Sequence, residues 1–376
     1  MTDTGMTTME VKKHNKNTVY NLIYRERSTC KLIITQKLQM GLSTVNQNLK
    51  LLEEEGLIQK NGFFESTGGR KADAIEIIPT VKISLGAAIL KDMIDIVATD
   101  LYGSILCSCT YSLTYKHDFA YYQQFSDYVH SFIQSNQLST VDILGLSIAT
   151  QGIISSEGNS VIYGKILDNQ AMSLQDLQPY FNFPCKLEHD SKAAANLELW
   201  KHQELSDAII LLLNRNMGGA IITDGTVHKG TNMHSGLIEH LSLNNDGALC
   251  YCGKRGCLET YCSADALAHV AGMDIPQFFN QLRNSGTTCQ AIWDEYLGYL
   301  AFAIRNLSII VNGKVIISGY LAPYFQEEDL NTLLRKINSI STFPLNRGDI
   351  IVGTTGQFTQ AVGASLHYIK EFLVQV

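Results

Sequence analysis

Apolar residues recur at helical spacing through residues 15–56 and predict three helices. The first falls in "NKNTVYNLIYRE", the second is the short run "LIITQKL", and the third is "LSTVNQNLKLLEEEG". The turn "QMG" separates the second from the third. The residues whose spacing predicts a buried face are Val19, Leu22, Ile23, Val45, Leu49 and Leu52.

The third predicted helix has a polar outer face. We expect Ser43 to cap its start and Gly56 to end it. Two short helices joined by a glycine-containing turn to an amide-rich helix are typical of a helix-turn-helix, whose last helix enters the DNA major groove. A docking domain with a solvated polar face is the alternative. The outward-facing residues are Thr44, Asn46, Gln47, Asn48 and Lys50, of which Ser43, Thr44, Asn46, Gln47 and Lys50 are the candidate DNA contacts.

A strand, a turn and a second strand follow in "GLIQKNGFFESTGGRKADAIEI", the pattern of a wing. The turn contains two glycines followed by Arg70 and Lys71, which are suited to phosphate or minor-groove contact. A plain basic turn is the alternative. The wing completes a DNA-binding domain over residues 1–78.

From residue 81 the pattern changes to apolar β-rich runs that alternate with helices. Strands are predicted in "VKISLGAAIL", "DIVATD", "SILCSCTYSL", "CKLEH", "AIILLLN" and "KVIISG", and helices over 119–134, near 173–180 and over 191–200. This alternation over nearly 300 residues predicts an α/β body in two lobes, 79–200 and 201–376, with C-terminal helices that can return to the first lobe. The apolar run 291–312 predicts a long helix that serves either the core or a subunit interface.

Composition adds a difference between head and body. Residues 1–78 carry a net charge of +2, and the remainder carries −9. A slightly basic head on an acidic body fits a nucleic-acid-binding segment joined to a small-molecule domain. No apolar run approaches the ~18 residues needed to span a bilayer, so we expect a cytoplasmic protein without membrane insertion.

The stretch "CYCGKRGC", residues 250–257, concentrates three of the nine cysteines. Their spacing is too tight for disulfides, and a catalytic thiol would need only one of them. Three thiols among glycines, with His240 ten residues upstream, form a Cys3His set suited to a closed, structural zinc site. Cys262 could compete as a ligand but lies outside the compact set. The predicted ligands are His240, Cys250, Cys252 and Cys257.

His240 followed by C-x-C-G-x-x-G-C-L-E resembles the zinc motif of the ROK family of repressors and sugar kinases. The resemblance covers essentially the whole chain, and the winged head resembles that of the repressor branch, which includes xylose-type and N-acetylglucosamine-type repressors. It implies an actin-like (ribonuclease H-like) sugar-kinase fold for the body.

The motifs that bind nucleotide in the family's kinases differ here. The family's Asp-x-Gly-Gly-Thr turn matches residues 84–88, "SLGAA", which lack the carboxylate. The second phosphate loop, Gly-Thr-Gly-x-Gly-Gly, matches "NRNMGG" (214–219), and the adenosine turn matches "SGY" (318–320). We therefore expect no phosphoryl transfer, since that reaction depends on positioning and metal.

The sugar side of the resemblance is mixed. Asp190 matches the family's catalytic base, and Glu259 and His240 match sugar-contacting positions. Leu237 stands where the family has a carboxylate, His189 replaces an Asn, and Lys165 and Lys192 are gained. These changes predict an anionic ligand such as a sugar phosphate or sugar acid; a decayed pocket or solvent-facing lysines are the alternative. The candidate ligand-binding residues are Asp190, His189, Glu259, His240, Lys165 and Lys192.

The sequence thus predicts a carbohydrate-responsive transcription regulator, a repressor that binds operator DNA as a homodimer or higher homo-oligomer and senses a sugar or sugar derivative. The second hypothesis is a sugar kinase with a DNA-binding head. A third is an interaction protein whose body docks a protein partner.

Overall fold

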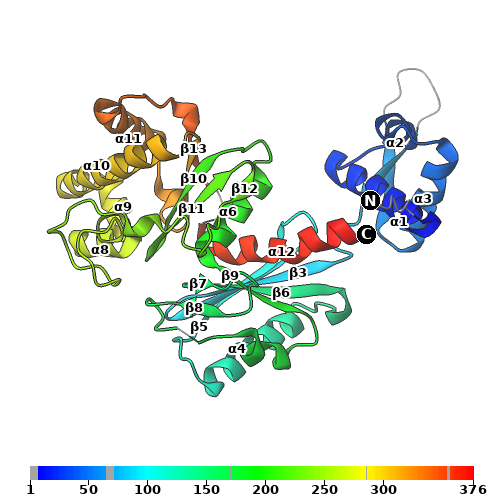
Figure 1. Cartoon of the computed structure of the whole chain (residues 1–376), viewed down its shortest axis with the longest axis horizontal. Coiled ribbons are helices and arrows are strands. Elements are labelled where there is room, and N and C mark those ends of the chain that lie inside the picture. Colours follow the sequence, from blue (N-terminus) through cyan, green and yellow to red (C-terminus); the bar gives the residue numbers. More distant parts are fainter. Residues whose placement is uncertain (1–6, 65–71, 170, 285, 354–355) are drawn as a thin grey trace.

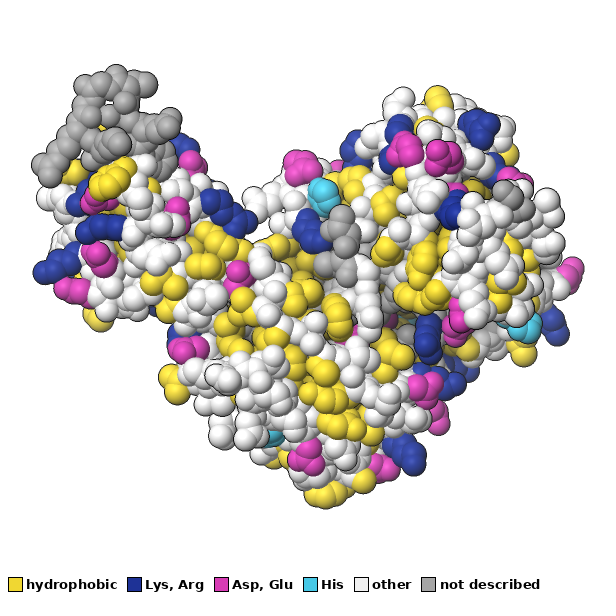
Figure 2. Space-filling model, turned by 180° about the vertical axis from the view of Figure 1, so that it is seen from behind, with side chains coloured by type: hydrophobic (Ala, Val, Ile, Leu, Met, Phe, Trp, Pro, Cys, Tyr) yellow, Lys and Arg dark blue, Asp and Glu magenta, His cyan; other side chains and the backbone are white. Residues whose placement is uncertain are grey.

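The computed structural model describes residues 7–64, 72–169, 171–284, 286–353 and 356–376. They form a small head beside a body of two lobes (Figure 1), and the head projects from one side of the body when the molecule is seen from behind (Figure 2). This is the α/β class expected, with a small head of helices and a hairpin in front of a two-lobed body. No helix among these residues is both long and apolar enough to cross a membrane.

Three helices and a two-stranded hairpin build the head. They are α1 (Thr8–Glu26), α2 (Lys31–Leu38), α3 (Leu42–Glu54), β1 (Ile58–Phe64) and β2 (Ala72–Ile77). The two strands pair antiparallel, and Thr29 adds a bridge to Ile75 beside them. All six residues predicted to face the core are buried, because the helical spacing sets them on one side of each helix.

Two details of the head differ from the prediction. α3 begins two residues earlier, so Gly41 occupies the N-cap position without a side-chain cap, and Ser43 lies inside the first turn. Asn48 is buried rather than outward-facing, and its amide donates back to the carbonyl of Thr44. An amide that satisfies itself on the preceding turn can be buried at little cost.

The first lobe is a five-stranded sheet in the order β5-β4-β3-β6-β9. Its strands are β3 (Ile83–Ile89), β4 (Met93–Thr99), β5 (Ile105–Ser112), β6 (Ile143–Thr150) and β9 (Cys185–His189), with α4 (Phe119–Ser135) on one face and the small hairpin β7 (Ile153–Ile154) and β8 (Val161–Tyr163) at the edge. The helix expected near 173–180 is one short turn, α5 (Leu174–Leu177), followed by a 3-10 turn.

The second lobe repeats this topology. Its sheet has the order β12-β11-β10-β13-β14, with the first three strands antiparallel and the last two parallel, as in the first lobe. The strands are β10 (Ala208–Leu213), β11 (Met217–Thr223), β12 (Thr226–Val227), β13 (Lys314–Ser318) and β14 (Ile350–Val352). The helices are α7 (Glu259–Cys262), α8 (Ala264–Ala271), α9 (Ile275–Arg283), α10 (Thr287–Ile310) and α11 (Glu327–Ile340). The inner face of α10 is core, whereas Ile309 and Ile310 remain exposed.

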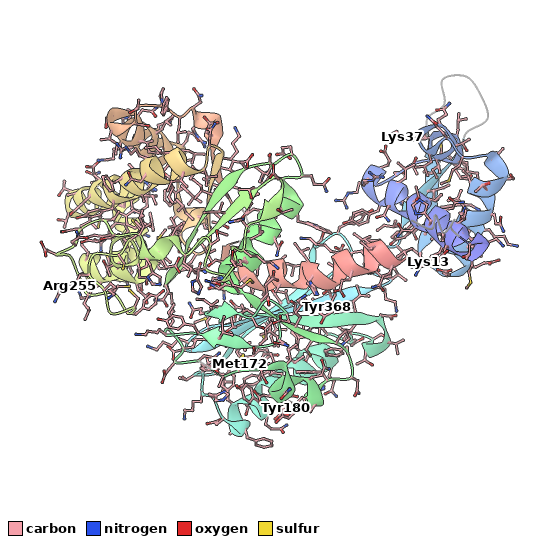
Figure 3. All side chains as sticks on the ribbon, in the orientation of Figure 1. Lys13, Lys37, Met172, Tyr180, Arg255 and Tyr368 are labelled. Atoms are coloured by element: carbon pink, nitrogen blue, oxygen red, sulfur yellow. The ribbon has the colours of Figure 1, made fainter. Side chains whose placement is uncertain are left out.

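Two helices lie where the lobes meet (Figure 1). α6 (Asp190–Lys201) contacts strands of both sheets, and α12 (Thr359–Gln375) crosses α6 and packs on β3, β4 and β6 of the first lobe. The crossing is close because Gly363 has no side chain; a Cβ there would lie 1.9 Å from the carbonyl oxygen of Ala193. Tyr368 of α12, labelled in Figure 3, fills the space beside Gly145 of β6. After packing on the first lobe, α12 ends beside the head (Figure 1).

Candidate metal centre and interlobe cleft

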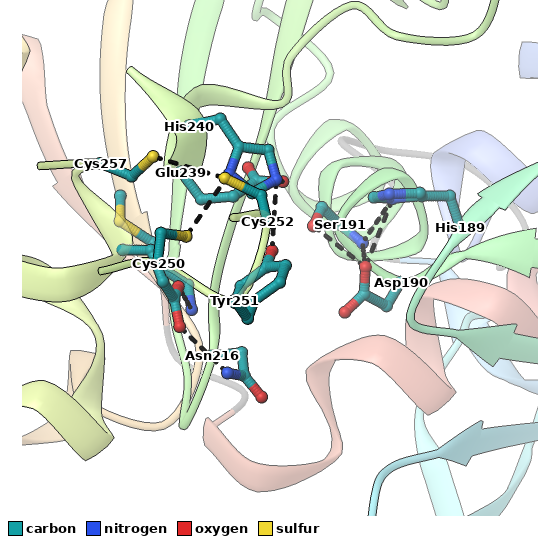
Figure 4. Close-up of polar contacts among 12 residues, drawn as sticks. His189, Asp190, Ser191, Asn216, Glu239, His240, Cys250, Tyr251, Cys252 and Cys257 are labelled. Atoms are coloured by element: carbon teal, nitrogen blue, oxygen red, sulfur yellow. Dashed lines mark hydrogen bonds and ion pairs between the residues drawn. The ribbon is translucent and has the colours of Figure 1, made fainter. Parts of the chain in front are cut away.

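One histidine and three cysteines converge at the edge of the second lobe. Ligand atoms of His240, Cys250, Cys252 and Cys257 all lie within 4.8 Å of one another. The Sγ atoms of Cys252 and Cys257 are 3.7 Å apart, and Nδ1 of His240 is 3.9 Å from Sγ of Cys250 (Figure 4). Tetrahedral zinc with Zn–S bonds of about 2.3 Å places sulfur atoms about 3.8 Å apart, so these side chains fit such an ion.

Glycines shape the loop that carries the cysteines. Gly253 has a φ of +86° and ends a tight turn in which its N–H donates to the carbonyl of Cys250. Gly256 has a φ of +70°, and a Cβ there would lie 1.5 Å from the carbonyl oxygen of Asn244. Both positions have a left-handed backbone that favours glycine, and Gly256 also lacks room for a side chain, so the two glycines between the cysteines fix the loop path.

The thiol of Cys252 is the most acidic of the set. Burial raises its pKa, but hydrogen bonds from the backbone of Lys254 and from the thiols of Cys250 and Cys257 outweigh burial and lower the pKa overall. Burial raises the pKa of Cys250 to about 12. A bound cation would lower the pKa of Cys250 again, because a cation favours the thiolate form of each ligand.

His240 connects this cluster with the cleft between the lobes. Its Nδ1 faces Cys250, whereas its Nε2 lies 3.4 Å from the hydroxyl oxygen of Tyr251 and 3.9 Å from Oε1 of Glu239. One ring nitrogen thus points to the metal position and the other to the cleft. A metal ion bound to Nδ1 would fix the imidazole ring and thereby the position of Nε2, which faces the cleft.

A cavity of about 130 Å³ lies in the cleft between the lobes. Asp190, the first residue of α6, lines it; its Oδ1 accepts from the N–H of Ser191 at 2.6 Å and from its hydroxyl at 3.1 Å (Figure 4). Its Oδ2 accepts from Nε2 of Gln360 on α12 at 3.3 Å. His189, buried beside it, and Lys165 also line the cavity, as the sequence predicted for ligand contacts.

Two residues of this cavity were missed by sequence reasoning. Oε2 of Glu239 and Oε1 of Gln151 are buried and have no hydrogen-bond partner among the described residues. Burial raises the pKa of Glu239 well above its usual range. Buried polar atoms without partners are costly, so these atoms suit a ligand rich in hydroxyl groups, which can both donate and accept. The only sequence signal was the position of Glu239 next to His240.

Two predicted ligand residues lie elsewhere. Glu259 does not line the cavity: its Oε2 accepts from the N–H of Met217 at 2.6 Å, and its Oε1 accepts from Nδ2 of Asn216 at 3.0 Å, so it anchors the β10–β11 turn. Lys192 faces a second cavity, because two residues along a helix turn the side chain by about 200° from Asp190.

The stretch matched to the first phosphate turn contains no turn. Residues 84–88 lie inside β3, where the hydroxyl of Ser84 donates to the carbonyl of Ser365 on α12. The turn between β3 and β4 is formed instead by Leu90, Lys91 and Asp92, which include no glycine. The strands expected in "VKISLGAAIL" and "DIVATD" already place the turn after residue 90, as the structure does, so the residues matched to the family's phosphate turn lie within β3.

The β10–β11 turn and the turn after β13 are joined to each other. Oδ1 of Asn214 accepts from the N–H of Tyr320 at 2.7 Å and lies 2.5 Å from where a Cβ on Gly319 would stand. The Asn214 side chain thus fills the space between the two segments matched to the second phosphate loop (214–219) and to the adenosine turn (318–320).

The DNA-contact candidates share one surface of the head. Ser43, Asn46, Gln47 and Lys50 are exposed and Thr44 is half-buried. Lys31, Asn46, Lys50 and Lys60 line one shallow groove between α2, α3 and the hairpin. Arg70 and Lys71 lie outside the described residues.

The model of the ROK family matches residues 91–371 of this chain. The chain belongs to the ROK family. Among ROK proteins, the xylose repressor of Caldicellulosiruptor bescii is 24% identical over 354 residues, which cover 88% of this chain and 89% of that protein. The DNA-binding transcriptional dual regulator NagC of Escherichia coli K12 is 26% identical over 260 residues, 68% of this chain and 64% of that protein.

Solved ROK structures share the fold. A ROK family transcriptional regulator, homolog of the E. coli MLC protein, matches with a TM-score of 0.74 at 18% identity, covering 97% of both chains. A ROK family glucokinase from Streptomyces griseus, in complex with glucose and AMPPNP, matches with a TM-score of 0.67 at 18% identity, covering 75% of this chain and 98% of that one. The shorter coverage by the glucokinase agrees with a ROK body that here carries an additional head.

Proposed function

We propose that this protein is a transcription regulator of carbohydrate metabolism, a repressor that binds operator DNA as a dimer and senses a sugar or sugar derivative in the cleft. The observation that carries the proposal is the exposed polar face of α3 on a head that α12 joins to the cleft. The repressor names of the ROK relatives support it.

α12 supplies the physical link between ligand and DNA. Near its start Gln360 donates to Asp190 in the cleft, and near its end the carbonyl of Leu373 accepts from the amides of Asn17 at 2.8 Å and Asn21 at 2.9 Å, both on α1. A ligand that changes the lobe angle therefore acts on the helix that holds the head. Paired recognition helices must lie about 34 Å apart to read two half-sites, so such a movement changes operator affinity.

Zinc is proposed as a structural ion. His240 and the three cysteines would hold it, and bound zinc would supply a fixed tetrahedral crosslink rather than chemistry. The crosslink would hold Tyr251 and His240 against the cleft. The two unpaired acceptors there, on Glu239 and Gln151, would take hydroxyl donors from the sugar.

A sugar kinase is the second candidate, favoured by the place of Asp190 in the cleft. The glycine-free β3–β4 turn and the Asn214 side chain weigh against it, because nucleotide phosphates need bare backbone amides. ADP release with a panel of monosaccharides, absent from an Asp190→Asn variant, would favour the kinase.

The regulator is tested by selecting DNA from a random pool with the full chain. We expect enrichment of a site with two inverted halves. Asn46→Ala combined with Gln47→Ala should lower affinity for it by at least about 30-fold, since each amide pair to a base is worth roughly 1–3 kcal/mol. Lys50→Ala should weaken selected and unselected DNA alike.

Gln290→Ala, which removes an exposed amide of the body, is the control and should bind as the unaltered protein does. If no sequence is enriched, or if the double variant binds the selected site with full affinity, the proposal is wrong.

A further inference from the structure

A second cavity lies between the lobes, separate from the one around Asp190. Its volume is about 360 Å³, and its lining comes from β9, α6, the segment after β12, and α12. Four of its lining residues are lysines: Lys186, Lys192, Lys229 and Lys370. Residues 79–376 contain only 18 Lys and Arg against 27 Asp and Glu, so this concentration of positive charge runs against the composition of the body.

These lysines have no matching set of carboxylates. Among the described residues none of the four makes an ion pair. Lys192 donates to the carbonyl of Met233 at 2.8 Å, and Lys370 donates to Oδ1 of Asn196 at 3.2 Å. Glu188 is the acidic lining residue, and burial raises its pKa to about 7 against the lowering effect of Lys370, Lys229 and Lys186.

Burial and the positive charges of the lysines lower the pKa values of basic groups in the cavity. Burial, then the charge of Lys229, lowers the pKa of Lys192 to about 8. Burial, then the charges of Lys186, Lys370 and Lys229, lowers the pKa of His367 to about 4, so this histidine is neutral at pH 7. Four lysines that face one cavity beside the single carboxyl of Glu188 raise the free energy of the empty site, and a bound anion relieves it.

The backbone makes room for this arrangement. Gly158, with a φ of +73°, leaves space for the stem of Lys186, whose Cε would lie 2.9 Å from a Cβ at that position. Lys186 and Lys192 come from the first lobe and α6, whereas Lys229 follows β12, an edge strand of the second lobe. An anion held between them would touch both lobes. His189 lines both cavities and separates them.

We propose that this cavity is a binding site for a phosphoryl group, carried by a small metabolite or free as inorganic phosphate. Lysines suit a phosphate as point charges, and a doubly charged oxyanion can accept from several of them at once. The site does not depend on the head reading DNA, and it is distinct from the sugar cavity.

The test is calorimetric titration of the full chain with inorganic phosphate and with a hexose 6-phosphate, at constant ionic strength in chloride. We expect saturable binding of at least one of them. Lys229→Gln with Lys370→Gln, both exposed residues, should weaken that binding at least about ten-fold through lost charge. Lys12→Gln with Lys116→Gln removes the same charge from exposed sites elsewhere and should leave affinity unchanged.

Lys165→Gln, in the other cavity, separates the two sites and should leave the affinity for inorganic phosphate in this cavity unchanged. Tighter binding of the sugar phosphate than of phosphate would identify a metabolite site; equal binding would identify a phosphate site. Failure of both probes to bind, or equal affinity in the Lys229/Lys370 variant, would overturn the proposal without touching the DNA-binding result.

Discussion

At the scale of single residues, the cysteine loop brings three thiol groups close to one another and to the imidazole of His240. Three thiols and an imidazole lie within 4.8 Å, and burial together with neighbouring thiols raises the pKa of Cys250 and of Cys257. Deprotonated thiols at this spacing repel one another unless a cation lies between them. A bound cation would remove this repulsion, which supports the zinc that we propose.

Cys250→Ser should remove this ion. We expect one equivalent of zinc in the purified protein, close to none in the variant, and a fall in the thermal midpoint on the order of 5–10 °C, because a structural ion contributes directly to folding. Elemental analysis and thermal unfolding measure both. Cys262→Ala is the control: Cys262 is buried outside the cluster, so its removal should leave the metal content unchanged. Unaltered protein without stoichiometric metal would contradict the assignment.

At the scale of elements, the α6–α12 crossing holds the body together. Small residues let the two backbones approach, and α12 also covers Gly86 of β3, where a Cβ would lie 1.9 Å from the carbonyl oxygen of Ala361. The crossing places Gln360 beside Asp190 at one end of α12 and leaves its other end free to hold the head. Side-chain volume at a few positions thus controls the alignment of cleft and head.

The same substitution at two helical glycines should have opposite effects. Gly363→Ala puts a methyl group against the carbonyl of Ala193, so we expect a loss of roughly 1–3 kcal/mol in the free energy of unfolding. Gly298→Ala, inside α10 with nothing within 4 Å of the new Cβ, should gain about 0.5–1 kcal/mol from helix propensity. Thermal unfolding distinguishes the two. A Gly363→Ala protein as stable as the Gly298→Ala protein would show that the crossing is not tight.

At the scale of the whole molecule, the head is attached to the body by contacts from two directions. The amides of Asn17 and Asn21 bind the end of α12, and the hydroxyl of Tyr24 donates to the carbonyl of Leu101 at 3.0 Å. The guanidinium of Arg27 lies 3.5 Å from the ring centroid of Tyr102, a cation–π contact. The head is thus fixed to the first lobe and to α12.

Asn17→Ala with Asn21→Ala should loosen this attachment. The carbonyl of Leu373 lies in the last turn of α12 and has no partner within that helix, so losing both donors should let the helix end fray. We expect hydrogen exchange over residues 368–376 to quicken roughly ten-fold, with exchange in the cleft unchanged. Thr18→Ala, whose hydroxyl bonds only within α1, is the control. Unchanged exchange in the double variant would mean that the amides do not hold the head.

The sequence by itself determined the local features. Helical periodicity predicted the buried faces of the head, because residues three and four apart share one side of a helix whatever surrounds it. The spacing of Cys250, Cys252 and Cys257 predicted their cluster, because a short glycine-containing loop leaves few other arrangements. The strand and helix alternation, with the ROK resemblance, predicted the two-lobed body.

Only the tertiary structure decided which distant groups meet. It placed Lys192 in a different cavity from Asp190, turned Glu259 onto the β10–β11 turn, and brought Glu239 into the cleft. It also placed residues 84–88, which the resemblance matched to a phosphate turn, inside β3. Such outcomes depend on helix rotation, strand length and the docking of α12, which are set by packing over the whole chain rather than by neighbours in sequence.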